Sequence, residues 1–144
     1  MDNFSHFLRQ ENSVLWNLAN SEHPFVKEVG DGSLSLDKFQ YYLKQDYIFL
    51  FDYCKVLAIA ASKSDSENMM SKWVTLLDET LNSEMDLHRS FCKDFGISEE
   101  ELENTQAVSS TSDYTNFLLE NAENNSIESI AISLLPCQWG YGEI

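Results

Sequence analysis

The 144-residue sequence is poor in the residues that make tight turns, with five glycines and two prolines. An all-β chain needs many such turns, so this composition argues against one. No segment approaches the run of about 18 apolar residues that a membrane-spanning helix requires. The opening decapeptide MDNFSHFLRQ lacks the apolar core of a secretory signal. We therefore expect a helical, cytoplasmic protein with no membrane as partner.

Basic side chains are also scarce, and none follows Lys93. The net charge is −15, and residues 65–144 alone hold 16 acidic and 3 basic side chains. A surface of this sign repels phosphate backbones and anionic lipid headgroups. The charge therefore excludes nucleic acid as an expected partner, and its ordinary role is to keep the protein in solution.

Cysteine is limited to Cys54, Cys92 and Cys137, an odd number without any CxxC spacing. This pattern fits neither a zinc ribbon nor a disulfide framework. Reduced thiols are typical of proteins that work in the cytosol, so the cysteines agree with a cytoplasmic location.

Apolar residues recur at helical spacing along most of the chain, without strand alternation or an internal repeat. Gly96 and Ser98 are expected to end one helix and cap the next. We expect one all-α domain over residues 1–144, built as a helical bundle. The predicted helices cover residues 4–20, 36–61, 66–95, 99–103, 114–122 and 127–143, with a helical turn at 26–29 and a polar connection at 104–113.

Pro136 stands inside the last predicted helix, directly before Cys137. It removes one backbone hydrogen bond and clashes with the carbonyl of Ile132, which predicts a kink or break. Tyr141 follows Cys137 by four residues and so lies on the same helix face. The cysteine could be a nucleophile with a phenol as neighbour, or it could be a small buried apolar residue.

Asp46 interrupts the apolar face of the long helix predicted for residues 36–61. Its spacing of three and four residues from Leu43, Phe49 and Leu50 directs it towards the interior. A buried carboxylate is costly unless donors surround it. The amine or the amidine-like ring edge of a ligand would supply them, and so would an N–H or hydroxyl group of the core.

Glu84 and His88 are one helical turn apart and could bind a metal or each other. A carboxylate-bridged di-iron site requires more Glu and His residues than this sequence offers. We therefore expect no metal, and a structural hydrogen bond between Glu84 and His88.

Aromatic residues are more numerous than a helical core requires, and buried tyrosines need partners for their hydroxyl groups. They predict a flat, polar-edged ligand held between rings, although half of them could simply pack on the bundle surface. The set comprises Tyr47, Phe49, Phe51, Tyr53, Tyr114, Trp139 and Tyr141.

Four stretches of the sequence resemble the TenA (thiaminase II) family, in family order and at family-like separations. The resemblance implies a heme-oxygenase-like all-α fold, a homotetramer, and no metal or organic cofactor. Because family members are about half as long again, it also implies that the C-terminal helices are lacking here. The stretches are HPFV at 23–26, FQYYLKQDYIFL at 39–50, EMDLHRSF at 84–91, and YT at 114–115 with LLPCQWGYGEI at 134–144.

The resemblance further implies hydrolysis at the aminomethyl carbon of a 4-amino-2-methylpyrimidine, which serves thiamine salvage, and in many members cleavage of thiamine. Cys137 would be the nucleophile, and Asp46 would hold the exocyclic amine and a ring nitrogen of the substrate. Tyr114 and Tyr141 would line the pocket. Phe49 stands where many members have tyrosine, which leaves the substrate preference open.

The family's proton-shuttling glutamate lies in a final helix well past the cysteine, and Glu143 is too close to Cys137 in sequence to replace it. The alternative is therefore a catalytically incomplete relative, which binds pyrimidines or only assembles.

Overall fold

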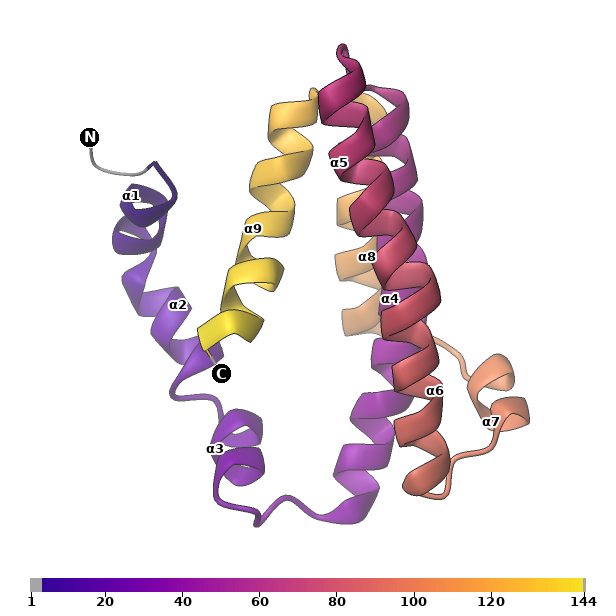
Figure 1. Cartoon of the computed structure of the whole chain (residues 1–144). Helices are drawn as coiled ribbons and strands as arrows, with labels where there is room; N and C mark the ends of the chain where they lie inside the picture. Colours follow the sequence, from indigo (N-terminus) through magenta and orange to yellow (C-terminus); the bar gives the residue numbers. More distant parts are fainter. Residues whose placement is uncertain (1–3, 144) are drawn as a thin grey trace. The chain divides into compact units, whose positions relative to one another are not determined.

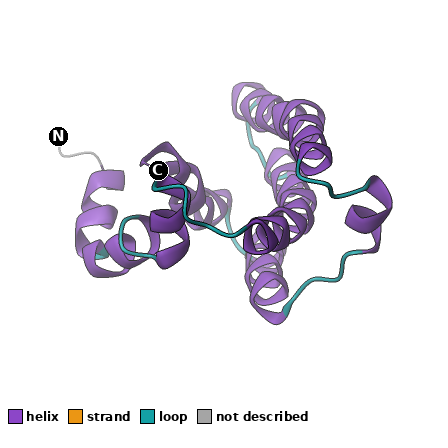
Figure 2. Cartoon of the chain, turned by 90° about the horizontal axis from the view of Figure 1, so that it is seen from below, coloured by secondary structure: helices purple, strands orange, loops and turns teal. Residues whose placement is uncertain are grey.

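The structure is a computed structural model that describes residues 4–143, and every regular element in that range is a helix (Figure 1). The all-α prediction is confirmed. Figure 2 shows the loops that join the helices. The elements are α1 (Phe4–Glu11), α2 (Ser13–Asn20), α3 (Pro24–Gly30), α4 (Leu36–Ser62), α5 (Glu67–Asp78), the π-helix η1 (Glu79–Glu84), α6 (Met85–Asp94), α7 (Glu99–Asn104), α8 (Ser109–Asn124) and α9 (Ile127–Glu143).

The helices group into two compact units, and the boundary between them falls inside α9. The first unit contains the chain up to Ser35 and again from Leu134, and the second contains Leu36–Ser133. The positions of the two units relative to one another are not determined. A single domain over residues 1–144 therefore stays a prediction.

The core of the second unit is centred on α4, which contacts α5, α6, η1 and α8. Leu57 and Ala60 are completely buried, and Tyr53 and Val56 are at most 2% exposed. Met85 of α6 and Leu118 of α8 are buried as well. Each fully buried aliphatic side chain contributes about 1.5–3 kcal/mol to folding, so these contacts fix the rotation of α4 about its axis.

The first unit joins the end of α9 to α1 and α2. Trp16 is buried, and its ring meets that of Trp139 edge to face at 5.5 Å. Glu143 accepts a hydrogen bond from Trp16 Nε1 at 2.8 Å and two from the Arg9 guanidinium at 3.0 Å each. These hydrogen bonds, first those from Arg9, lower the pKa of the Glu143 carboxyl.

Two predicted boundaries are wrong because local or tertiary hydrogen bonds override the sequence pattern. The helix predicted for residues 4–20 breaks at Asn12, whose side-chain amide donates to the Leu8 carbonyl at 2.8 Å and so competes with the helical backbone. Helix α8 begins at Ser109 instead of Tyr114. Gln45 holds its start, by accepting from the Val108 N–H and donating to the Gln106 carbonyl, both at 3.0 Å.

Two further differences concern proline and the π-helix. Helix α9 is continuous through Pro136, so the predicted break does not occur, while a kink stays a prediction. Helix α3 starts at Pro24 itself, where a missing N–H is tolerated, and His23 Nδ1 accepts from the Phe25 N–H. The helix predicted for 66–95 is helical throughout 67–94, but it widens into the π-helix η1 between α5 and α6.

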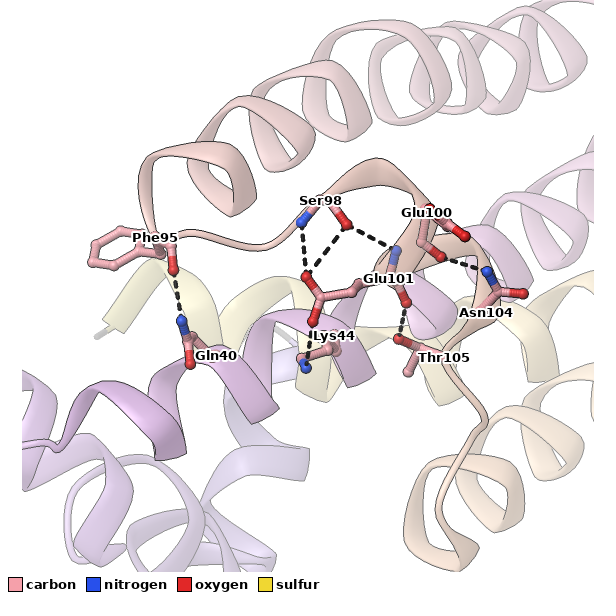
Figure 3. Close-up of polar contacts among 8 residues, drawn as sticks. All are labelled: Gln40, Lys44, Phe95, Ser98, Glu100, Glu101, Asn104 and Thr105. Carbon is pink, nitrogen blue, oxygen red and sulfur yellow. Dashed lines mark hydrogen bonds and ion pairs between the residues drawn. The ribbon is translucent and has the colours of Figure 1, made fainter.

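The predicted end of α6 and start of α7 are confirmed. Gly96 adopts a φ of 78°, which favours glycine. Ser98 then forms a capping box with Glu101: Ser98 Oγ accepts from the Glu101 N–H at 3.2 Å, and the Glu101 carboxylate accepts from the Ser98 N–H at 3.1 Å (Figure 3). Gln40 of α4 anchors this connection by donating to the Phe95 carbonyl at 2.7 Å.

Replacing Ser98 with alanine should lower the free energy of unfolding by about 1 kcal/mol, because alanine has no hydroxyl oxygen to accept from the Glu101 N–H. Urea denaturation followed by circular dichroism measures the change. The control is Ser90→Ala on the exposed side of α6, for which we expect a change within about 0.5 kcal/mol. Equal effects of the two substitutions would contradict the capping role.

Candidate functional site

Asp46 and His88 meet between α4 and α6. The side chain of His88 is 8% exposed and that of Asp46 is 17% exposed. His88 Nδ1 lies 3.6 Å from Asp46 Oδ2, and His88 Nε2 lies 2.8 Å from the Leu43 carbonyl oxygen. The predicted hydrogen bond between Glu84 and His88 is therefore replaced by contacts across the helix interface. Sequence spacing could not reveal them, because they depend on how α6 packs against α4.

The carboxyl of Asp46 has a strongly perturbed affinity for protons. Burial raises its pKa from 3.8 to about 6, the charged form of His88 acts to lower it, and Glu84 raises it. A carboxyl of this kind exists in both protonation states near neutral pH, so it can either donate or accept a hydrogen bond. Such groups are common where proton transfer occurs.

Phe49 and Tyr114 form a parallel aromatic pair next to this carboxyl along α4. Their ring centroids are 5.6 Å apart at an interplanar angle of 4°. Phe49 also stacks on the buried Tyr53 of α4 at 5.7 Å. Because Phe49 follows Asp46 by three residues, both side chains project from neighbouring positions on one side of the helix.

Cys137 and Tyr141 lie on α9, in the first unit, whereas Asp46, Phe49 and Tyr114 belong to the second. Cys137 is partly buried, and Tyr141 is 58% exposed. The structure thus joins Phe49 to Tyr114 and places Asp46 one turn away. A pocket shared with Cys137 and Tyr141 stays a prediction.

The other aromatic residues named above have varied surroundings. Phe51 is 52% exposed and lies beneath the Lys55 ammonium at 4.6 Å. Tyr47 stacks on His88 at 6.2 Å, and the Arg89 guanidinium lies 5.8 Å from its ring centre. Trp139 packs against Trp16 in the first unit. The exposed ring of Phe51 agrees with the expectation that part of the aromatic set packs on the bundle surface.

A groove of about 720 Å³ lies between α6 and α7. Its lining mixes basic and acidic side chains, among them Arg89, Lys93 and Glu103. None of the five residues predicted to form the site lines this groove.

Among residues 4–143, no three His, Cys, Asp or Glu side chains gather as a metal site would require. Every helix in the same range is too short or too polar to traverse a bilayer.

Comparison with known proteins identifies the family to which the chain belongs. Residues 10–144 match the TENA/THI-4/PQQC family. The chain belongs to this family. Two solved TenA structures share its heme-oxygenase-like helical fold and cover 96% of the chain. They are a TenA family transcription regulator from Silicibacter sp. TM1040, with a TM-score of 0.92 and 33% identity, and a TenA homologue from P. horikoshii OT3, with a TM-score of 0.91 and 28% identity.

Two relatives within this TenA-containing family are named aminopyrimidine aminohydrolase. The protein of Halalkalibacterium halodurans is 42% identical over 98% of this chain, and that of Helicobacter pylori is 34% identical over 95%. The chain spans 62% and 63% of the length of these relatives, and 61% and 64% of the two solved structures.

Replacing Asp46 with asparagine should change how stability depends on pH. Between pH 3.8 and about 6 the folded protein binds a proton at Asp46 that the unfolded chain has lost. Wild-type stability at this residue is therefore lost as the pH rises through that window. Asparagine does not ionise, so its variant lacks this loss. The free energy of unfolding of Asp46→Asn, relative to that of the wild type, should therefore increase by up to about 3 kcal/mol from pH 4 to pH 8.

Urea unfolding at a series of pH values measures this difference. Asp65→Asn, in the exposed loop before α5, is the control and should follow the wild type at every pH. If Asp46→Asn instead became relatively less stable as the pH increased, the desolvated carboxylate would be ruled out.

Proposed function

We propose that this protein hydrolyses 4-amino-2-methylpyrimidines in thiamine salvage, converting aminomethylpyrimidine to hydroxymethylpyrimidine and ammonia. Thiamine, which contains the same ring, is the second candidate substrate. The observation that carries the proposal is the desolvated carboxyl of Asp46, one helical turn from the parallel rings of Phe49 and Tyr114. The names of the Halalkalibacterium and Helicobacter relatives support the same reaction.

Asp46 suits the edge of an aminopyrimidine ring. That edge presents an exocyclic N–H donor beside a ring nitrogen that accepts, so a protonated carboxyl satisfies both at once. The ring faces would pack against Phe49 and Tyr114, as aromatic side chains do with flat ligands. Burial, which raises the pKa of Asp46 to about 6, makes the protonated form available near neutral pH.

Cys137 is the proposed nucleophile, with Tyr141 as its hydrogen-bonding neighbour one turn later on α9. The thiolate forms a bond to the ring carbon adjacent to the one bearing the aminomethyl group, while a ring nitrogen takes the proton of Asp46. The ring electron pair then forms an exocyclic double bond, and the ammonium substituent leaves as ammonia. Water adds to the exocyclic carbon, the ring electrons expel the cysteine as thiolate, and Asp46 regains its proton.

The setting of the reaction is also part of the proposal. Residues 1–144 would belong to one helical domain that works in the cytoplasm as a homotetramer, without a metal or organic cofactor. Cys54, Cys92 and Cys137 form no disulfide, which suits a reducing compartment. The exposed apolar side chains Val14 and Leu15 of α2, at 72% and 68%, favour assembly over a monomer.

Cys137→Ser should lower the rate of ammonia release from aminomethylpyrimidine by at least about 1000-fold, because the hydroxyl is a far weaker nucleophile than the thiolate. Cys54→Ala, which alters a buried thiol of α4, is the control and should retain most of the activity. Release of ammonia by a coupled assay and of thiazole from thiamine by chromatography measures both reactions. Equal background rates for wild type and Cys137→Ser would refute the nucleophile.

Phe49→Leu should raise KM for aminomethylpyrimidine by about 2- to 10-fold, since loss of one ring from a stacked pair costs about 0.5–1.5 kcal/mol. Phe51→Leu is the matched control, because that ring is exposed on the same helix and should leave KM unchanged. Steady-state kinetics with both variants provide the measurement. A protein that binds the pyrimidine at the Phe49 site but never turns it over would instead be a binding relative.

A further inference from the structure

Both ring nitrogens of His88 face an oxygen atom of α4. The Leu43 carbonyl oxygen, 2.8 Å from Nε2, can only accept a hydrogen bond. Nε2 must therefore carry a hydrogen in every protonation state of the ring that keeps this bond. The remaining nitrogen, Nδ1, is the one that points towards Asp46 Oδ2 at 3.6 Å.

A proton on either Nδ1 or Oδ2 makes the contact between these two atoms favourable. Without it, the lone pair of Nδ1 and the negative charge of the carboxylate would face each other, with the imidazole only 8% exposed. With it, the pair is either an imidazolium beside a carboxylate or an imidazole beside a carboxylic acid. Both arrangements are neutral overall, and both are favoured where hydration is lost.

Other groups around the pair disfavour removal of this proton. Glu84, from η1, raises the pKa of Asp46 after burial has already done so. Cys92 of α6 lies close enough to interact electrostatically with Asp46. Burial raises the pKa of its thiol, and the charge of Asp46 raises it further. The Arg89 cation lies further out, over the ring of Tyr47.

We propose that His88 is a positioning residue, which shares one proton with Asp46 between Nδ1 and Oδ2 and so fixes the orientation of the carboxyl that holds the substrate ring. Its role in turnover rests on the proposed function, whereas the shared proton does not. In turnover the pair supplies this one proton: the carboxylic acid form of Asp46 gives it to the ring nitrogen of the substrate, and the ring nitrogen returns it to Asp46 when the cysteine leaves. No proton then has to come from solvent during the addition step.

Nuclear magnetic resonance of the full chain without substrate tests the shared proton directly. We expect His88 Nε2 to carry a hydrogen at every pH at which the protein is folded, and the Nδ1 resonance to shift when the carboxyl of Asp46 changes its protonation state. Loss of the Nε2 hydrogen while the protein stays folded, or an Nδ1 resonance that does not respond to the carboxyl of Asp46, would overturn the proposal.

Two substitutions should move the pKa of Asp46 in opposite directions. His88→Gln keeps an amide N–H for the Leu43 carbonyl and removes the cation, so the pKa of Asp46 should rise above its wild-type value. Glu84→Gln, at an exposed position, removes the neighbouring negative charge, so the pKa should fall. If residue 88 had only a structural effect, the two substitutions would not shift the pKa of Asp46 in opposite directions. An unchanged pKa in both variants, or shifts in the same direction, would contradict the proposal.

Kinetics separate the further inference from the proposed function. If wild type releases ammonia, the limb of the pH profile of kcat/KM that reports Asp46 should shift to higher pH in His88→Gln and to lower pH in Glu84→Gln. If the wild type shows no turnover, the proposed hydrolase function is refuted. The shared proton is still tested in that case, because the nuclear magnetic resonance measurement on Asp46 and His88 needs no substrate. If His88→Gln does not fold, wild type and Glu84→Gln decide the outcome.

Discussion

A carboxylate inside a packed helix bundle must replace the hydration that it has lost. The group of α6 that faces Asp46 is His88, with Nδ1 3.6 Å from Oδ2, and His88 is itself held by the Leu43 carbonyl one turn earlier on α4. The three groups form a closed arrangement in which α4 supplies both ends and α6 supplies the middle. The orientation of the acid is thus set by the packing of two helices, and a group on a flexible loop would not be fixed in this way.

The packing of α4 makes this arrangement possible. Completely buried small and aliphatic residues towards its C-terminal end, such as Leu57 and Ala60, hold it against its neighbours. The same rotation that buries them turns Asp46 towards α6 and brings the ring of Phe49 to Tyr114 of α8. Stability and the proposed chemistry therefore depend on the same helix, with the acid near the middle and the densest packing beyond it.

Much of this fold follows from the sequence, because apolar periodicity and the absence of turn residues are local signals. The bounds of α4 were predicted to within one residue, and the caps at Gly96 and Ser98 obey local rules. The start of α8 was missed, since it depends on Gln45, which is more than 60 residues away in sequence. The partner of His88 was missed for the same reason: spacing along a helix predicts neighbours on that helix and is silent about the facing one.

The candidate site divides along similar lines. The inward position of Asp46 could be predicted from its apolar neighbours, and its desolvation agrees with that reasoning. The roles of Cys137 and Tyr141 came from family resemblance, and they lie in the unit that α9 shares with α1 and α2. Periodicity could not place two units relative to each other, because every repeat that it detects is internal to one helix.

The π-helix η1 has a consequence for how this segment tolerates change in length. A π-turn accommodates an extra residue within an otherwise continuous helix, and each residue rotates a helix by about 100°. Residues from Met85 onward therefore have their angular phase set by the six residues of η1. Deleting one of those residues would rotate His88 away from α4, although every side chain of α6 remained the same. This segment should therefore tolerate substitutions better than insertions or deletions.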